Sequence, residues 1–292
     1  MTWELTGVPY TSAARPGGIA EAITVLRAGG LAARLGVLGV SDGGDLDLEP
    51  PNGRRGSSGL LNEAALTRLV EASAERVQAT RERGHRALMV GGDCPILLGA
   101  LAALRAAGDQ PGLVMLDGHE DAWPPHLSPT GEASDSEVAI ALGLTGVELP
   151  PPLADLTPLV QPNAVVLLGP RDREEIEAGG AQSLRDLVAY FADPARLRND
   201  GVRAAMTDAL DAIDRSSFWL HVDLDVLATD AFAAVDYPQT GGLEWFELDQ
   251  LTAVATADPR CVGASIAIYN PVHDVHGSGS EAVTAFVCRL VS

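Results

Sequence analysis

Three short segments of the sequence concentrate side chains that can bind metal ions. They read Gly91-Gly92-Asp93-Cys94, Asp117-Gly118-His119-Glu120-Asp121 and Asp223-Leu224-Asp225. In the last two segments the acidic or imidazole side chains alternate with other residues, and this spacing places them on one side of an extended chain. Carboxylate oxygens with one imidazole nitrogen suit Mn²⁺ or a similar divalent ion. Bridging carboxylates could hold two such ions about 3.5 Å apart and activate the water between them. The segments therefore predict a metal centre suited to hydrolysis.

Each segment follows a short apolar run that we expect to form a buried strand. Continuous apolar runs are typical of parallel strands covered on both faces, and they occupy residues 87–90, 113–116, 164–168, 218–222 and 262–268. Helical patterns occupy residues 62–83, 95–107, 181–191, 202–213, 246–255 and 279–291, and residues 41–59 have the composition of a surface loop. Alternating strands and helices predict a doubly wound α/β fold, whose ligand site lies at the carboxyl ends of the strands. The three polar segments should meet there.

A simpler interpretation applies to each acidic residue taken alone. An aspartate directly after a strand is usually a turn residue or the N-cap of the next helix. Several carboxylates at three strand ends are harder to explain in this way, because buried like charges repel one another unless cations offset them. The cluster as a whole therefore favours a metal site.

Composition limits the other classes of function. The 292 residues carry 40 acidic and 20 basic side chains, a formal net charge of -20, and every basic residue is arginine. Nucleic acid is not an expected partner, because phosphate binding needs a clustered positive surface, and lysine-dependent Schiff-base chemistry is excluded. Three cysteines without a pairing pattern, no signal peptide and no apolar run of about 20 residues predict a cytoplasmic protein away from the membrane. No linker divides the chain, so one domain over residues 1–292 is expected.

The order GGDxx, DxHxD, DxD resembles the ureohydrolase superfamily, which includes arginase, agmatinase and formimidoylglutamase. Further similarity extends over most of the chain, in Gly7-Val8-Pro9-Tyr10, Gly169-Pro170-Arg171-Asp172, Gly241-Gly242-Leu243 and Asn270-Pro271. The resemblance implies a three-layer α/β/α domain around a mainly parallel sheet of about eight strands. It also implies a binuclear manganese centre that hydrolyses linear amidine or guanidine C–N bonds of a small molecule. Homo-oligomers are common among such proteins.

The resemblance also implies a role for each residue of the three segments. Asp117 and Asp223 match the carboxylates that bridge two ions. Cys94 and Asp121 match ligands of one ion, and His119 and Asp225 match ligands of the other. A bridging hydroxide would attack the trigonal carbon, and Asp121 would then pass its proton to the leaving amine.

Cys94 is the first of several departures from the pattern, since most relatives have histidine there. A thiolate is a softer ligand than imidazole and would favour Zn²⁺ or Fe²⁺ over Mn²⁺. Alternatively, Cys94 is a buried structural thiol beside a single ion.

The other departures concern substrate binding. Ile268 stands where the resemblance implies a carboxylate for the guanidinium, and Glu132, Asp236 or Glu244 could replace it from elsewhere. Ser134 stands in place of a proton-shuttling histidine, and Trp123 replaces a small polar residue. Glu174 matches an acid that binds the substrate's α-amine, or it is a solvated charge at the start of a helix.

Two functions follow from this pattern. The first is a metal-dependent hydrolase that acts on an amidine or guanidine other than arginine, with a less polar or uncharged end suited to Ile268 and Trp123. The second is a catalytically silent relative that binds a ligand or partner, because function resides in the site and not in the fold.

Overall fold

The computed structural model describes residues 2–292 and contains one eight-stranded sheet. Its strand order is β2-β1-β3-β8-β7-β4-β5-β6, and every neighbouring pair is parallel. The strands are β1 (Trp3–Gly7), β2 (Ser41–Asp45), β3 (Arg86–Val90), β4 (Gly112–Leu116), β5 (Val165–Leu168), β6 (Tyr190–Ala192), β7 (Phe218–Asp223) and β8 (Cys261–Ala267). The predicted α/β class and parallel sheet are confirmed, whereas a single domain over residues 1–292 stays a prediction.

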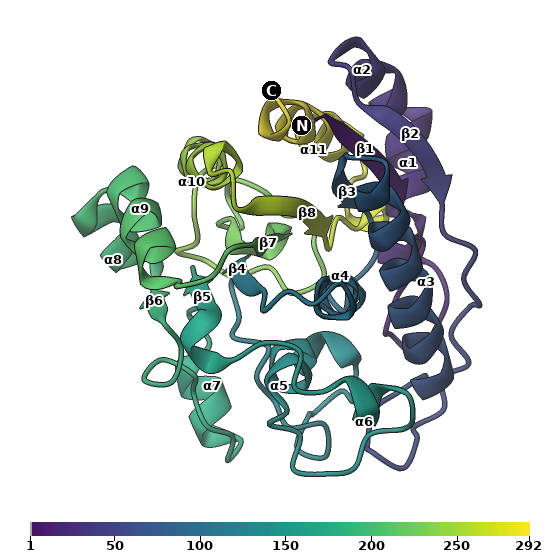
Figure 1. Ribbon diagram of the computed structural model, residues 1–292, viewed down its shortest axis with the longest axis vertical. Coiled ribbons are helices and arrows are strands. Elements are labelled where there is room, and N and C mark those ends of the chain that lie inside the picture. The colour runs from purple at the N-terminus through teal and green to yellow at the C-terminus, as the bar shows by residue number, and fades with distance from the viewer. Residues whose placement is uncertain (1) are drawn as a thin grey trace.

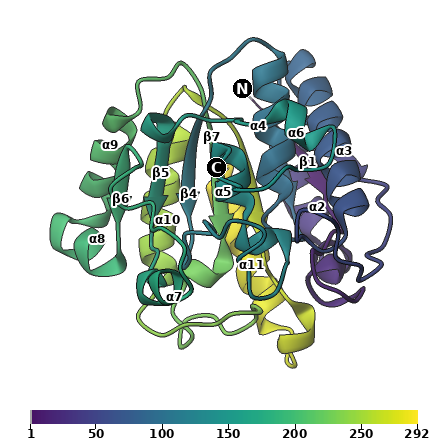
Figure 2. The same cartoon turned by 90° about the horizontal axis from the view of Figure 1, so that it is seen from below.

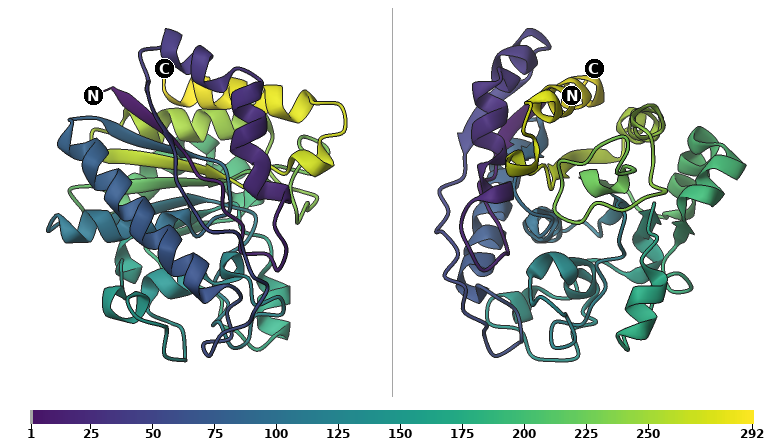
Figure 3. Two further views of the ribbon diagram at one scale, coloured as in Figure 1. Left: turned by 90° about the vertical axis from the view of Figure 1, so that its right-hand side faces the viewer. Right: turned by 180° about the vertical axis from the view of Figure 1, so that it is seen from behind.

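Helices cover both faces of this sheet (Figure 1). They are α1 (Ala22–Ala28), α2 (Leu31–Val37), α3 (Glu63–Glu82), α4 (Ile96–Ala106), α5 (Glu137–Leu142), α6 (Leu153–Leu156), α7 (Arg173–Ala178), α8 (Pro194–Asp200), α9 (Val202–Ala212), α10 (Trp245–Ala257) and α11 (Ser278–Leu290). Figure 3 shows the strands lying between the helical layers. None of the helices within residues 2–292 has both the length and the apolar character needed to cross a membrane.

Two apolar cores lie on opposite faces of the sheet, and strand alternation divides the side chains between them. In β3, Leu88 and Val90 belong to the core that also contains side chains of α1, α2, α9, α10 and α11. Ala87 and Met89 of the same strand pack with α3, α4 and α5 on the other face. Because both faces are buried, the strand sequences are apolar without interruption.

The predicted helix over residues 181–191 is wrong. Residues 185–187 form a turn, and residues 190–192 form the edge strand β6. The Glu120 carboxylate accepts hydrogen bonds from Ser183 Oγ at 2.7 Å and from the Leu184 N–H at 2.5 Å, which holds the chain in the turn. A side chain distant in sequence therefore overrides the local helical pattern.

The prediction of a loop over residues 41–59 is wrong at its start, because Ser41–Asp45 forms the edge strand β2. This segment has almost no apolar character, and within residues 2–292 it pairs with β1 alone. Arg27 of α1 donates to Asp42 and Asp45, each at 2.7 Å, and fixes the strand from outside the sheet. The sequence therefore predicts the central strands of this sheet better than its edge strands.

The strand order determines where the polar segments meet. Cys94 lies in the turn between β3 and α4, Asp117 directly follows β4, and Asp223 ends β7. β8 pairs with both β3 and β7, so that it lies between the Cys94 turn and the end of β7. Figure 2 shows β4, β5 and β6 side by side, with α8 and α9 beyond β6. The three segments therefore lie together at the carboxyl ends of the central strands.

Candidate metal centre

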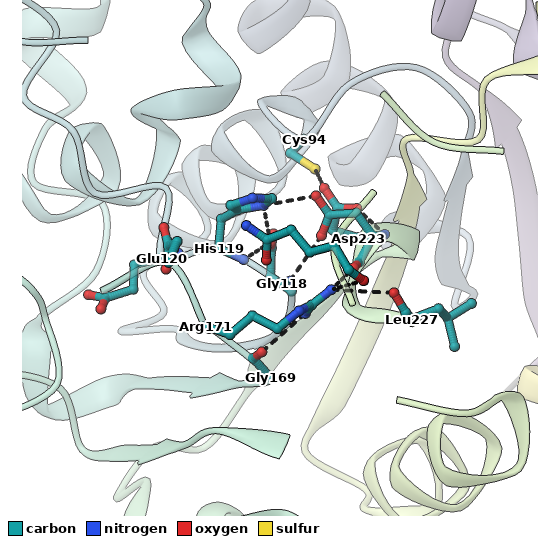
Figure 4. Close-up of polar contacts among 12 residues, drawn as sticks. Cys94, Gly118, His119, Glu120, Gly169, Arg171, Asp223 and Leu227 are labelled. Atoms are coloured by element: carbon teal, nitrogen blue, oxygen red, sulfur yellow. Dashed lines mark hydrogen bonds and ion pairs between the residues drawn. The ribbon is translucent and has the colours of Figure 1, made fainter. Parts of the chain in front are cut away.

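Side chains from the three segments contact one another directly at these strand ends. Cys94 Sγ lies 2.9 Å from Asp223 Oδ2, and His119 Nδ1 lies 2.9 Å from Asp225 Oδ2. Figure 4 shows the Cys94 thiol pointing at Asp223, with His119 beside it. Cys94, Asp223 and Asp225 are all buried.

Asp117 lies at the centre of the arrangement. Three groups of side chains have possible ligand atoms that all lie within 4.8 Å of one another, and each group contains Asp117. The first comprises Cys94, Asp117, Asp121 and Glu137, the second Asp117, His119 and Asp225, and the third Cys94, Asp117 and His221. A carboxylate shared by all three groups is the residue that would bridge two ions if both were bound.

Backbone N–H groups orient one oxygen of each of three carboxylates. Asp117 Oδ1 accepts from the His119 N–H at 2.7 Å, Asp223 Oδ1 from the Asp225 N–H at 2.6 Å, and Asp225 Oδ1 from the Gly118 N–H at 2.9 Å. The second oxygen of each is left to face the cluster. Asp117 Oδ2 is buried without a hydrogen-bond partner among the described residues. Such an atom is costly unless a cation or proton reaches it.

Arg171 anchors the loop that carries Asp225. Its Nη2 lies 2.8 Å from the backbone oxygen of Asp225 and 3.3 Å from that of Leu227, and the guanidinium lies beneath the cluster in Figure 4. The Arg171 N–H in turn donates to the Gly118 carbonyl at 2.9 Å. The GPRD segment therefore joins the loop after β4 to the loop after β7.

The electrostatics of the cluster favour protonated carboxyl groups or added positive charge. Burial and the neighbouring Asp121 and Asp223 carboxylates raise the pKa of Asp117 well above its ordinary range. Burial and the Asp223 charge do the same to the pKa of the Cys94 thiol. Burial works against a protonated His119, but the Asp225 carboxylate outweighs it and raises the pKa of His119 to about 9. Cations bound among these groups would remove the penalty on their ionised forms.

Asp121 has a backbone conformation that few residues adopt. Its φ of 45° lies in the left-handed region, which aspartate tolerates better than most residues. Its carbonyl oxygen accepts hydrogen bonds from the N–H groups of Val138 at 3.1 Å and Ala139 at 3.4 Å, at the start of α5. Asp121 is thereby held against α5 while its side chain faces Asp117.

A cavity of about 360 Å³ opens above the donors. Trp123, Ser134 and Ile268, all predicted to contact substrate, line it together with His119 and Asp121. Its other lining residues include Asp93, Glu132, Asp135, Asp172, Glu175, Asp236 and Tyr237. The wall is therefore more acidic than the substrate end expected from Ile268 and Trp123 alone.

The structure separates the three carboxylates considered as replacements at position 268. Glu132 and Asp236 line the cavity with Ile268, whereas Glu244 caps α10 in a capping box with Glu247. Glu174 is exposed and lines only a neighbouring surface hollow, while the next residue, Glu175, lines both that hollow and the cavity. Ile268 itself has a φ of 71°, an unfavourable conformation for a β-branched side chain.

Known proteins with the same architecture carry related activities in their names. The sequence matches the Arginase family over residues 3–292. The chain belongs to this family. An arginase from Brevibacillus brevis is 27% identical over 98% of this chain and 96% of its own length. The structure of arginase from Bacillus caldovelox has a TM-score of 0.83 at 22% identity and covers 100% of this chain and 98% of its own. Formimidoylglutamase from Bacillus subtilis has a TM-score of 0.76 at 16% identity, covering 100% of this chain and 86% of its own.

The donor set of this arginase-family protein fits divalent cations. Arginase-family proteins generally use a binuclear manganese centre, and the groups around Asp117 supply carboxylate, imidazole and thiol donors within one coordination sphere of each other. The unpartnered Asp117 Oδ2 is the observation that fits a cation there most directly.

Two buried residues of the cluster are absent from the sequence-based predictions. His221 lies two residues before Asp223 in β7, and this spacing places both side chains on the same face of the strand, so the signal was available. Glu137 lies 16 residues after Asp121, and no spacing rule connects them. Its place depends on the packing of α5.

Proposed function

We propose that this arginase-family protein is a metal-dependent hydrolase that cleaves a C–N bond of a linear amidine or guanidine other than arginine. The observation that carries the proposal is the convergence of three donor groups on Asp117 at the base of a cavity of about 360 Å³. Cavities of this size accept small organic molecules. The assignment to hydrolysis follows from the family and from this donor set.

The donors divide between two ion positions. Cys94 and Asp121 would hold one ion and His119 and Asp225 the other, with Asp117 and Asp223 shared between them. Two divalent ions bound there would supply a hydroxide nucleophile at neutral pH. Manganese is favoured by the family, and zinc or iron by the thiol of Cys94. Asp121 lines the cavity and would pass a proton to the leaving amine.

The cavity wall supports a substrate without a carboxylate. Glu132 and Asp236 face the cavity, and no arginine lines it within residues 2–292. Burial and the nearby charges of Asp93, Asp135 and Asp236 raise the pKa of Glu132 to about 7, which reflects the density of negative charge. A substrate carboxylate would be repelled there, whereas an amine or guanidinium would be attracted.

A substrate panel tests the proposal. Arginine, hydroxyarginine, agmatine, guanidinobutyrate and formimidoylglutamate would be assayed with Mn²⁺, Zn²⁺, Fe²⁺ and Ni²⁺. We expect the highest kcat/KM for agmatine, the member of the panel that lacks a carboxylate, and loss of that activity in Asp117→Ala and Asp223→Ala. Turnover of arginine above that of agmatine would contradict the substrate class.

The second candidate is a silent relative that binds a ligand or partner. Ile268 and Ser134 favour it, because neither can hold a guanidinium by charge or shuttle a proton. Metal binding with no turnover of any panel member would support this alternative.

A further inference from the structure

Glu137 is a buried carboxylate with no internal hydrogen-bond partner. It is the first residue of α5, its residue surface is fully buried, and both carboxylate oxygens lack a partner among residues 2–292. A glutamate in the first turn of a helix is usually an exposed residue that stabilises the helix dipole. Full burial excludes that solvated role for Glu137.

The start of α5 holds this side chain against the metal centre. The Asp121 carbonyl oxygen accepts the N–H groups of Val138 and Ala139, the two residues that follow Glu137. The carboxylate of Glu137 lies within 4.8 Å of possible ligand atoms of Cys94, Asp117 and Asp121, which also lie within that distance of one another. Four donors with this mutual spacing can surround a single ion, since tetrahedral sites are built from four ligands.

The positive groups near the cluster are engaged elsewhere. His119 pairs with Asp225, and Arg171 donates to backbone carbonyls of the loop after β7. Removing a carboxylate from water without a partner costs several kcal/mol per ion in folded proteins. A proton shared with Asp121 would satisfy Glu137 alone, whereas a cation satisfies Glu137 and the unpartnered Asp117 Oδ2 together.

We infer that Glu137 is a ligand of the ion on the Cys94 side of the centre, together with Cys94, Asp117 and Asp121. This inference rests on the metal centre of the proposed function and adds to it a donor that the family resemblance does not supply. With the shared Asp223, the ion on that side would then be surrounded by a thiol and four carboxyl groups of this chain.

His221 is the competing donor. Its Nε2 is buried and unpartnered, and its atoms lie close to Cys94 and Asp117. However, its Nδ1 already pairs with Ser265 Oγ at 2.6 Å, and the same oxygen accepts from Trp219 Nε1 at 2.9 Å. A neutral imidazole can keep one nitrogen unpaired for the cost of a single hydrogen bond, whereas Glu137 leaves two carboxylate oxygens unpaired. The cation is therefore assigned to Glu137.

Metal titration of the full-length protein tests this assignment without any assay of activity. Wild type, Glu137→Gln, His221→Asn and Glu120→Gln would be loaded with Zn²⁺ or Co²⁺. Ions per chain would be counted by elemental analysis, and affinities measured by competition with a chelator. Glu120→Gln is the matched control, because Glu120 is an equally buried carboxylate that accepts from Ser183 and Leu184 and points away from the cluster (Figure 4).

We expect Glu137→Gln to lower the affinity for one ion by at least about tenfold and to leave the other ion bound. The cobalt–thiolate charge-transfer band of Cys94 should weaken or shift in this variant, while Glu120→Gln keeps the wild-type band and stoichiometry. If Glu137→Gln does not fold, Glu137→Asp serves instead, since a carboxylate withdrawn by one methylene should also lower the affinity.

Two results would overturn the inference. Wild-type affinity in a folded Glu137→Gln would mean that a proton satisfies the Glu137 carboxyl, and loss of the ion in His221→Asn alone would assign the donor to His221. Either result leaves the proposed function standing as long as wild type binds metal. Wild-type protein that binds no ion would overturn both.

Discussion

The thiol of Cys94 and the carboxylate of Asp223 form a hydrogen bond of 2.9 Å between two strands that are not neighbours in the sheet. Cys94 follows β3 and Asp223 ends β7, with β8 between them. This contact holds the thiol proton at the position where a cation would be shared by the two side chains. Metal binding must displace that proton, because the thiolate is the form that coordinates metals.

Replacement of Cys94 by histidine should change which metal the centre prefers. Imidazole removes the soft thiolate ligand, so Cys94→His should raise the affinity for Mn²⁺ relative to Zn²⁺ by at least about tenfold. Competition titrations with the two ions measure the ratio. Cys94→Ser is the control, because it removes sulfur without adding a nitrogen. It should lower the affinities for Mn²⁺ and Zn²⁺ alike. An unchanged ratio in Cys94→His would support a structural thiol outside the coordination sphere.

Substitution of Arg171 should destabilise the fold and the metal centre together. Arg171→Met leaves the Asp225 and Leu227 carbonyls without their donor and should lower the free energy of unfolding by about 2–3 kcal/mol. Arg173 is a matched control two residues away, since it is exposed and pairs with Glu177 on the surface. Arg173→Met should leave the free energy of unfolding nearly unchanged, because exposed ion pairs contribute little. Urea denaturation compares the two variants, and equal losses would argue against the anchoring role of Arg171.

A carboxylate introduced at position 268 should increase activity on guanidines. Ile268 lines the cavity beside Glu132 and Asp236 and offers no charge. Ile268→Glu should raise kcat/KM for guanidine substrates by roughly ten- to a hundredfold, the value of one charge-assisted pairing. Ile268→Gln, which has nearly the same shape without the charge, should not. Equal activity of the two variants would mean that Glu132 or Asp236 already binds the guanidinium.

The metal-free protein should lose stability as the pH rises from about 4 to about 6. Burial raises the pKa of Asp93 from 3.8 to about 6, although Ser12 and the Cys94 N–H donate to it. The folded state therefore keeps a proton that the unfolded chain releases above pH 3.8, which makes unfolding more favourable through this interval. The contribution of Asp93 is about 3 kcal/mol at most. Denaturation of chelator-treated wild type and Asp93→Asn at several pH values isolates the contribution of Asp93. If the free energy of unfolding depends on pH in the same way in both proteins, Asp93 is not the group responsible.

The centre of the sheet and its three polar segments were predictable because both depend on short-range patterns. Apolar runs identify β4 and β7, and the acidic residues at their ends identify the cluster. Glu137 was not predictable, since its position depends on the hydrogen bonds between Asp121 and the start of α5. The turn before β6 was missed for the same reason, because Glu120 holds it from 63 positions away in the sequence. Long-range polar contacts leave no periodic signal.

The position of β8 also has a consequence for biosynthesis. This strand begins at Cys261, far from β3 in the sequence, yet it pairs with β3 and β7 and so separates the Cys94 turn from Asp223. A nascent chain that lacks β8 cannot set the spacing of these two side chains, because the pairing of β8 with β3 and β7 forms only after β8 has been synthesised. Ion capture should therefore wait until β8 has been synthesised, and nascent chains halted before residue 261 should bind metal no better than unfolded protein.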